Sequence, residues 1–446
     1  MGEKGTDPFT PIFDGPTEST PADGKWLKRT LDDSPPVPDD SFMYIYKVGV
    51  VGAGLMGSGI AQVISYSGIP VVLKDVSDEV VQKGLAAARA VYEGRVKKGK
   101  MSPEELEGKM ALIQGTTAWS DFKDVDLAIE VVPETIDLKR KVFAEMDAAC
   151  PAHAILATNT SALSISAMAA ATKRPAQVAG LHFFYPAPAM KLVEVIPALQ
   201  TSAETADALV AFAEGLRKIP VKVKECAGFL VNRLLLPYLN EACLALQEGA
   251  AEAKAIDETC CAFGLPLGPF ILADSLGVDI CRHVAGTLYA AYGERAKPAL
   301  LIEKLFAAKL HGMKSGAGFY VYDGRSPEPL PGLIAAAQTE TGVKGTAFSI
   351  DRLLYPMVNE AAFCLDEAVC APSDIDVAMM AGTGWPQATG GLLKWADAVG
   401  LDKITAALDG WRKTLGTRFL PAPLLRRMVD AGWTGKAAGR GFYSYS

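Results

Sequence analysis

The chain has 446 residues, of which 50% are hydrophobic and 21% charged, which describes a folded protein of about three domains rather than a disordered chain. A net charge of −7 excludes the basic footprint of a nucleic-acid-binding protein, and four histidines leave few candidates for metal or proton chemistry. Eight cysteines without a CxxC pair, with neither a long apolar run nor a signal segment, predict reduced thiols, no metal site, no membrane contact and a cytoplasmic location.

The first 43 residues differ in composition from the rest of the chain. They contain seven prolines, nine acidic and four basic side chains, and so contribute −5 of the net charge. Such a segment buries little apolar surface. We therefore expect residues 1–43 to be a disordered acidic tail.

From Tyr44 onward, short apolar segments alternate with helical stretches. The segments YIYKVGVV, PVVLKDV, DLAIEVV, AILATNTS and QVAGLHFFY are typical of strands, and the sequence between them is typical of helices. This alternation predicts a parallel, doubly wound α/β sheet over residues 44–222.

The motif GAGLMG at residues 52–57 follows the first of these strands and opens a helix. In that context Gly52 allows a tight turn, Gly54 lets a pyrophosphate approach the backbone, and Gly57 permits close packing of helix and strand. Asp75 ends the next strand, where its carboxylate would bind ribose hydroxyls and repel a 2′-phosphate. The pattern predicts a dinucleotide site that favours NAD over NADP. A glycine turn that serves packing alone is the alternative.

The segment GLHFFYPAPAMKLVEVI places His182 near the end of a strand and Glu194 among apolar neighbours of the next one. An unpaired buried carboxylate is costly, and the chain turns back between the two residues, so we expect a hydrogen bond between them. Such a pair would make His182 a proton acceptor near neutral pH. A core pair without a catalytic role is the alternative.

After Val223 the sequence becomes helical and repeats itself. Residues 228–249 align with residues 347–368 at ten identical positions of twenty-two, including Arg233 with Arg352. A repeat this long indicates a duplicated domain. We expect helical domains at residues 223–323 and 347–446, joined by a linker at residues 324–346.

Together these motifs resemble the L-3-hydroxyacyl-CoA dehydrogenase family, specifically the dehydrogenase portion of multifunctional fatty-acid β-oxidation enzymes. The resemblance covers about Tyr44 to Ser446 and includes PETIDLKRKVF, TNTSAL, GFLVNRLL and KSGAGFY. It implies an α/β Rossmann-type dinucleotide-binding domain followed by two tandem all-α domains of the 6-phosphogluconate-dehydrogenase-like type. The implied activity is NAD-dependent oxidation of L-3-hydroxyacyl-CoA to 3-ketoacyl-CoA.

The resemblance also implies roles for individual residues. His182 would be the catalytic base and Glu194 its orienting partner, while Ser161 and Asn232 would contact the reacting oxygen of the substrate. The implied cofactor-binding residues are Gly52, Gly54, Leu55, Met56, Gly57, Asp75, Glu134, Lys139, Ser161, Tyr185 and Lys314. From residue type alone, Ser161 and Asn232 could be simple caps, and Lys139 and Lys314 solvated surface charges.

Two departures from the family pattern bear on function. Tyr185 replaces the asparagine of the usual HFFNP motif, so the pocket near the reacting carbon is expected to differ. An acidic tail stands where multifunctional relatives carry a hydratase-isomerase segment, so we expect no hydration of enoyl-CoA by this chain. In the second helical copy Asp351 stands where the first has Asn232, which predicts no substrate role for that copy.

The resulting hypothesis is an NAD-dependent dehydrogenase of acyl-CoA substrates. Arg95 and the lysines that follow it are candidates for the CoA phosphates, although a solvated helix face explains them as well. The alternatives are a dehydrogenase of a free hydroxy acid and a non-catalytic NAD-binding scaffold of a β-oxidation complex. The two helical copies are expected to pack together as a pseudo-two-fold pair in a monomer, which could associate with a hydratase or a thiolase.

Overall fold

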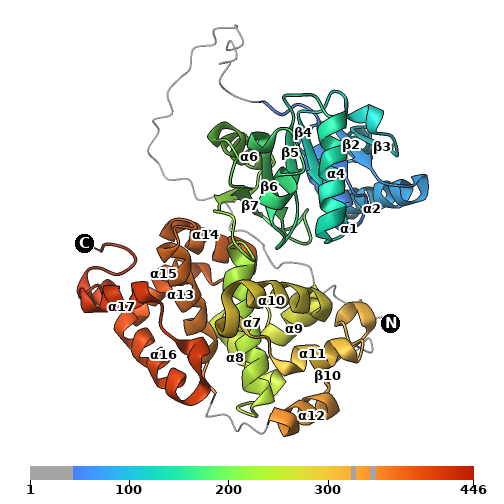
Figure 1. Ribbon diagram of the computed structural model, residues 1–446. Coiled ribbons are helices and arrows are strands. Elements are labelled where there is room, and N and C mark those ends of the chain that lie inside the picture. Colours follow the sequence, from blue (N-terminus) through green and yellow to red (C-terminus); the bar gives the residue numbers. More distant parts are fainter. Residues whose placement is uncertain (1–43, 323–327, 342–347, 446) are drawn as a thin grey trace. The chain divides into compact units, whose positions relative to one another are not determined.

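The predicted strands of residues 44–222 form one eight-stranded sheet in the computed structural model, which describes residues 44–322, 328–341 and 348–445 (Figure 1). The predicted acidic tail lies outside these residues. The strands follow the order β3-β2-β1-β4-β5-β6-β7-β8. Their bounds are β1 Val48–Val51, β2 Val71–Lys74, β3 Ile113–Thr116, β4 Leu127–Glu130, β5 Ile155–Thr158, β6 Val178–Phe183, β7 Leu192–Pro197 and β8 Ile219–Lys222.

The sheet is mixed rather than wholly parallel. Strands β1 to β6 pair in parallel, but β7 pairs antiparallel with β6, and β8 runs parallel to β7. The reversal arises because residues 184–191 connect β6 to β7 by a short loop instead of a crossover helix. The prediction of a doubly wound sheet is confirmed, with this correction at one edge.

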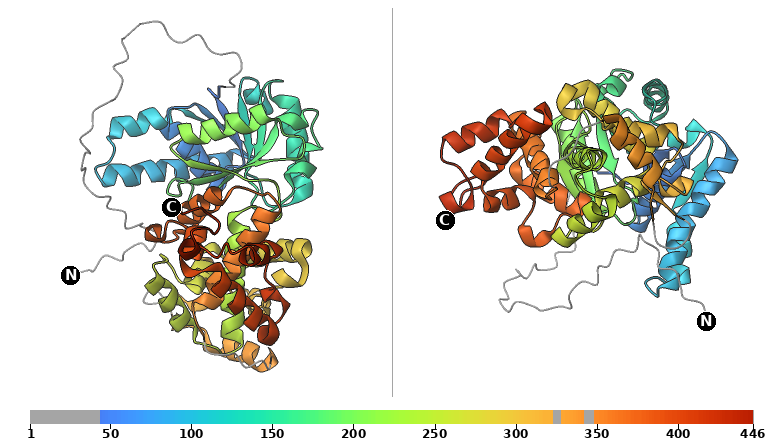
Figure 2. Two further views of the ribbon diagram at one scale, coloured as in Figure 1. Left: turned by 90° about the vertical axis from the view of Figure 1, so that its left-hand side faces the viewer. Right: turned by 90° about the horizontal axis from the view of Figure 1, so that it is seen from below.

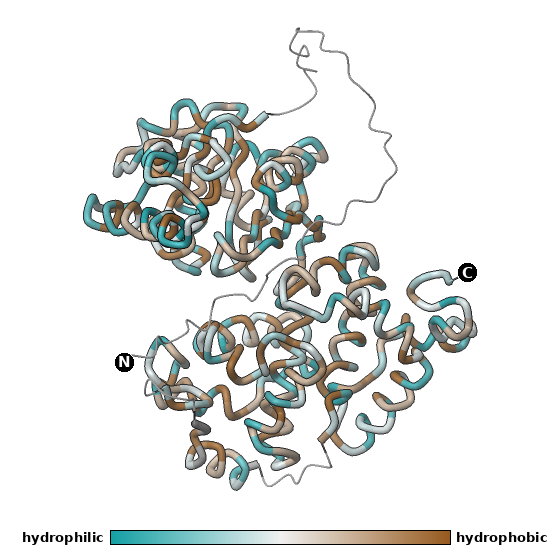
Figure 3. Tube along the Cα trace, turned by 180° about the vertical axis from the view of Figure 1, so that it is seen from behind, coloured by the Kyte–Doolittle hydropathy of each residue, from teal (hydrophilic) through white to brown (hydrophobic). Residues whose placement is uncertain are grey.

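Helices cover both faces of the sheet (Figures 1 and 2). Their apolar residues join the alternating faces of the strands, which form the hydrophobic interior of this part of the chain (Figure 3). On one face lie α1 Leu55–Tyr66, α2 Asp78–Lys97 and α6 Ala203–Gly215, and on the other lie α4 Ile136–Ala149 and α5 Ile165–Ala169. The helix α3 Pro103–Met110 packs beside α2.

The remainder of the chain is helical and contains the expected duplication. The first copy has α7 Val231–Gln247, α8 Ala253–Phe263, α9 Pro269–Leu276, α10 Val278–Tyr292 and α11 Leu300–Ala307. The second has α13 Asp351–Asp366, α14 Pro372–Thr383, α15 Leu392–Val399, α16 Leu401–Leu415 and α17 Pro423–Asp430. Each copy thus follows the same helix order.

The predicted linker, residues 324–346, is partly folded. It includes α12 Pro331–Thr341, in which Ile334 and Ala337 are buried. The side-chain amide of Gln338 donates to the carbonyl of Leu246 in α7 at 2.9 Å. The Pro- and Gly-rich composition concealed this helix, because its apolar residues are few and gain their burial from α7 and α11.

Helices α7 and α13 pack against each other and exchange ion pairs. Arg233 of α7 lies 2.7 Å from Glu360 of α13, and Arg352 of α13 lies 2.8 Å from Glu241 of α7. Both the two arginines and the two glutamates are 119 residues apart (352 − 233 and 360 − 241), so each pair is the pseudo-two-fold image of the other. This reciprocity is what an isologous dimer interface shows between separate chains.

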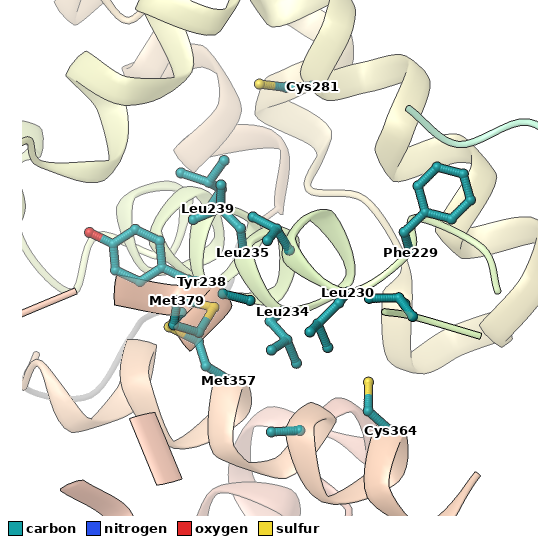
Figure 4. Close-up of a cluster of buried hydrophobic side chains, with 14 of the residues drawn as sticks. Phe229, Leu230, Leu234, Leu235, Tyr238, Leu239, Cys281, Met357, Cys364 and Met379 are labelled. Carbon is teal, nitrogen blue, oxygen red and sulfur yellow. The ribbon is translucent and has the colours of Figure 1, made fainter. Parts of the chain in front are cut away.

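Apolar side chains fill the interface between these two helices. Leu230 and Leu234 extend towards the helix that carries Cys364 (Figure 4). Six apolar residues of these two helices are all buried, namely Leu234, Leu235, Leu239, Leu353, Leu354 and Val358. The predicted burial of this face within one chain is confirmed.

Within the described ranges, no helix is long and apolar enough to cross a lipid bilayer. The eight cysteines all lie in these ranges, and each is free.

The reciprocal ion pairs predict that replacing a buried arginine lowers the free energy of unfolding much more than replacing an exposed one. Removing Arg233 breaks a buried ion pair and leaves Glu360 with only the longer contact to Arg295, at 3.3 Å, so Arg233→Met should lower the free energy of unfolding by about 3 kcal/mol. Arg427→Met is the matched control, because Arg427 pairs with Asp366 while its side chain is 60% exposed; it should cost less than about 1 kcal/mol. Urea unfolding followed by tryptophan fluorescence compares the two. Equal losses would show that the buried pairs do not hold the copies together.

Candidate active site

The glycines at residues 52–57 build the turn between β1 and α1. Gly52 has a φ of +113°, and a Cβ there would lie 2.6 Å from the carbonyl oxygen of Val131. A Cβ at Gly57 would lie 1.8 Å from the carbonyl oxygen of Gly52. At Gly54 a Cβ would meet nothing within 4 Å. Two of the glycines are therefore required by packing, whereas the third leaves an open approach to the backbone.

Helix α1 begins at this open position. Gly54 is its N-cap and supplies no side-chain hydrogen bond to the first turn. Leu55, the first helical residue, is 68% exposed, and Met56 is half-buried. An uncapped helix N-terminus attracts anions through its amides and dipole, so this turn fits a dinucleotide pyrophosphate.

Asp75 lies beside the glycine turn. It directly follows β2, and its carboxylate accepts hydrogen bonds from the amides of Ala53 and Val76, both at 2.7 Å. The strand order places β1 next to β2, which brings the acidic side chain and the glycine turn to the same end of the sheet. A carboxylate at this position suits ribose hydroxyls and disfavours a further phosphate.

A buried ion network lies at the carboxyl end of β4. The amine of Lys139 is 2.7 Å from Glu130 and 3.1 Å from Glu134, and its side chain is 1% exposed. Glu134 also accepts from the Thr160 hydroxyl and, at 3.0 Å, from the Ser161 amide. Burial would raise the pKa of Glu134, but Lys139 and these hydrogen bonds hold it below its ordinary value. The network fixes the loop that carries Ser161.

The two predicted cofactor lysines differ in exposure: the side chain of Lys139 is 1% exposed, whereas that of Lys314 is 49% exposed, as expected of a surface charge. Lys139 is enclosed by Glu130 and Glu134, so in this structure its amine supports Glu134. Lys314 lies in the 3₁₀ turn Met313–Ser315 of the first helical copy and pairs with Asp279 at 2.5 Å. Among the described residues, no hydrogen bond or ion pair joins Lys314 to the glycine turn.

His182 and Glu194 are directly opposite each other on β6 and β7. The Nδ1 atom of His182 lies 2.7 Å from a carboxylate oxygen of Glu194, and both side chains are buried, at 5% and 0% exposure. The imidazole also packs against the rings of Phe184 and Phe229, with centroids 4.5 and 5.8 Å away. The predicted hydrogen bond is present.

The second oxygen of Glu194 caps helix α7. It accepts hydrogen bonds from the amides of Leu230 and Val231, at 3.0 and 2.9 Å. These amides belong to the start of the helix, where the positive end of the helix dipole lies. Two backbone donors and one imidazole thus satisfy the Glu194 carboxylate in an apolar setting.

Ser161 and Asn232 meet at the same place. The side-chain amide of Asn232, in the first turn of α7, donates to the carbonyl oxygen of Ser161 at 3.3 Å. Asn232 follows Val231, whose amide binds Glu194. All four predicted catalytic residues are thus linked through the start of α7. Ser161 makes these contacts through its main chain, and Asn232 through its side chain.

Tyr185 lies in the loop after β6, next to a cis peptide bond with Pro186, and is 47% exposed. Tyr185 stands two residues beyond Phe183, the last residue of the strand that carries His182.

Several residues of the site were not among the predictions. Glu130 and Thr158 share a hydrogen bond of 2.7 Å beneath the Ser161 loop, and the side chain of Asn159 accepts from the amide of Phe183 at 2.8 Å. Each follows or ends an apolar strand, as LAIE and TNTS show, and a polar residue at that position was the available signal. Among the described residues, no group of His, Cys, Asp and Glu is arranged to hold a metal ion.

Comparisons with known proteins agree with this geometry. Residues 47–226 match the model of the 3-hydroxyacyl-CoA dehydrogenase NAD binding domain, and residues 228–322 and 348–445 match that of its C-terminal domain. The glyoxysomal fatty acid beta-oxidation multifunctional protein MFP-a of Cucumis sativus is 37% identical over 408 residues, covering 89% of this chain and 56% of that protein. The fatty acid oxidation complex subunit alpha of Shewanella amazonensis is 38% identical over 401 residues, covering 87% and 56%.

The chain thus spans about half the length of the curated relatives it matches. Among solved structures, 3-hydroxybutyryl-CoA dehydrogenase from Escherichia coli K12 matches with a TM-score of 0.79 and 29% identity, over 87% of this chain and 100% of that one. The family models cover both the dinucleotide-binding part and the two helical copies. The chain therefore belongs to the 3-hydroxyacyl-CoA dehydrogenase family of NAD-dependent oxidoreductases.

Proposed function

We propose that this chain oxidises L-3-hydroxyacyl-CoA to 3-ketoacyl-CoA with NAD, reversibly, as a step of fatty-acid β-oxidation. The observation that carries the proposal is the buried His182 and Glu194 pair, at 2.7 Å, in the same sheet as the glycine turn. Family membership supplies the substrate class. The hydrogen bond between His182 and Glu194 supports a base with an orienting carboxylate, and the meeting of Ser161 and Asn232 supports a contact to the reacting oxygen.

His182 acts as the proton acceptor. Because Glu194 binds at Nδ1, the proton of the neutral imidazole resides on Nδ1, and the lone pair is on Nε2. That nitrogen takes the proton of the substrate hydroxyl during oxidation and returns it during reduction. The packed rings of Phe184 and Phe229 keep the imidazole in one orientation.

Glu194 stabilises the imidazolium that forms when His182 is protonated. One of its oxygens accepts from the α7 amides and the other lies against His182, so an imidazolium at His182 is paired with this carboxylate as soon as it forms. Ser161 and Asn232 position the oxygen of the reacting carbon. Bound NAD supplies the acceptor for the hydride that leaves that carbon.

The residues proposed to hold NAD fit the group. The open approach at Gly54 and the uncapped start of α1 suit the pyrophosphate, and Asp75 suits the adenosine ribose. The remaining proposed contacts are Gly52, Leu55, Met56, Gly57, Glu134, Ser161, Tyr185 and Lys314, with Lys139 acting through Glu134.

Partners and location remain predictions. The relatives' names describe multifunctional proteins and complex subunits, which supports association of this chain with a hydratase or a thiolase. The α7 and α13 interface supports a monomer, because each copy covers the face that the other would otherwise expose. A cytoplasmic location is likewise an expectation from the sequence.

The direct test is NADH oxidation with 3-ketoacyl-CoA thioesters from C4 to C16, cyclic analogues, and the matching free keto acids. We expect turnover of thioesters and little of free acids. Turnover of free acids alone would instead establish the rival dehydrogenase. NADH binding without turnover of any compound would establish a non-catalytic scaffold.

His182→Gln should lower turnover by about two to four orders of magnitude and leave NADH affinity nearly unchanged, because it removes the base but not the dinucleotide site. Glu194→Gln should also impair turnover. Steady-state kinetics and fluorescence titration with NADH measure both effects. Wild-type turnover in His182→Gln would remove the assignment of the base.

Asp75 should confer a strong preference for NADH over NADPH. Asp75→Ala removes the carboxylate that repels the 2′-phosphate, so the ratio of the two kcat/KM values should fall by about tenfold or more. Asp78→Ala, in the first turn of α2, is the acidic control. Equal use of both cofactors by the unaltered protein would contradict this role of Asp75.

Tyr185→Asn should change the substrate profile. Asparagine is smaller than tyrosine and leaves more space at the end of the strand of His182. We therefore expect kcat/KM to rise for straight-chain thioesters, or the preferred acyl group to change. The same thioester panel measures it. Identical profiles for the two proteins would show that this position does not set specificity.

A further inference from the structure

The loop of residues 184–191 lies between the two strands of the proposed catalytic pair. It carries Tyr185 and joins the strands of the catalytic pair. The carbonyl of Pro186 accepts from the amides of Ala189 and Met190, at 2.9 and 3.0 Å, so the loop closes into a single turn. Such a turn needs external contacts to hold it against the rest of the molecule.

One side of this loop lies against α1. A Cβ at Gly59 would be 3.4 Å from Pro188 and 3.5 Å from Ala187, so the loop approaches the helix backbone closely. This is the helix whose start we propose to bind the pyrophosphate. The loop therefore connects the cofactor side of the site with the strand of His182.

Lys218 holds the other side. Its amine donates to the carbonyl oxygens of Ala187 and Met190, at 2.6 and 2.7 Å. The next residue, Ile219, begins β8, and its amide donates to the carbonyl of Lys191 at 2.8 Å. The lysine thus spans the turn at the point where β8 already fixes its end.

The amine of Lys218 binds backbone carbonyls and no carboxylate among the described residues. Both acceptors are neutral backbone groups, and burial lowers the pKa of the amine to about 8. By comparison, Lys222, the last residue of β8, is exposed and pairs with the carboxylate of Asp207 at 2.6 Å. Burying a lysine amine without a carboxylate partner costs free energy. The two charge-assisted hydrogen bonds to the loop offset this cost.

We propose that Lys218 is a positioning residue, which fixes the loop of residues 184–191 through two carbonyls and so holds the phenol of Tyr185 in place beside the substrate. The kinetic part of this inference rests on the proposed dehydrogenase function, whereas the structural part does not. Lys218 does not touch the reacting atoms. It affects the preference for one acyl group over another indirectly, by holding Tyr185.

The structural arm compares Lys218→Met with Lys222→Met by hydrogen exchange. Loss of the amine should speed exchange of the Ala189 and Met190 amides by about tenfold or more, the effect of one lost charge-assisted hydrogen bond. Lys222→Met should leave these amides unchanged. Lys218→Arg, which keeps the charge and the donors, should restore part of the protection. Unchanged exchange in Lys218→Met would overturn the inference, whether or not the protein oxidises hydroxyacyl-CoA.

The kinetic arm tests whether the support acts through Tyr185. Lys218→Met should lower kcat/KM for the preferred thioester roughly 10- to 100-fold, with NADH affinity unchanged. In the Tyr185→Asn background the same change should have a much smaller effect, because the two residues then act as one unit. Additive effects, or faster exchange with unaltered kinetics, would contradict a positioning role. Absence of turnover in the unaltered protein would count against the proposed function alone.

Discussion

One buried carboxylate, that of Glu194, connects the sheet to the helices that follow it. One oxygen binds the imidazole of His182, and the other binds the first amides of α7. Removing one of these donors would leave the buried carboxylate short of a partner, at a cost of about 1–3 kcal/mol. The carboxylate, the imidazole and the start of α7 therefore fix one another's positions. Because Asn232 is in the first turn of α7, the same carboxylate also sets where that amide lies relative to His182.

A second buried carboxylate, Glu130 at the end of β4, binds Lys139 and Thr158 beneath the Ser161 loop. Helix α7 is in turn fixed on its far side by α13, through apolar contacts and the reciprocal arginine pairs. The duplication therefore bears on the proposed chemistry, since the second copy packs against the helix whose first amides bind the Glu194 carboxylate. Asp351 occupies the corresponding place in the second copy, at the start of α13.

Patterns of local sequence predicted the features that depend on spacing. The alternating apolar residues around Glu194 predict that it is buried, and the glycines at residues 52–57 predict a tight turn. Both depend only on residues that are close in sequence. The burial of Lys139, the bonds of Lys218 and the helix α12 depend on elements far away in sequence, so local patterns could not show them. The strands β3 and β8 were missed for a related reason: they are edge strands, partly exposed, and β8 contains Pro220.

The most direct test of this account is the tautomer of His182, read by ¹⁵N NMR of the protein labelled at histidine. The His182→Gln spectrum identifies the signals of this ring among those of the four histidines. The account predicts a proton on Nδ1 and an unprotonated Nε2 in the neutral ring, with this preference weakened in Glu194→Gln. A neutral ring protonated at Nε2 would contradict it, because the nitrogen assigned to accept the substrate proton would already carry one.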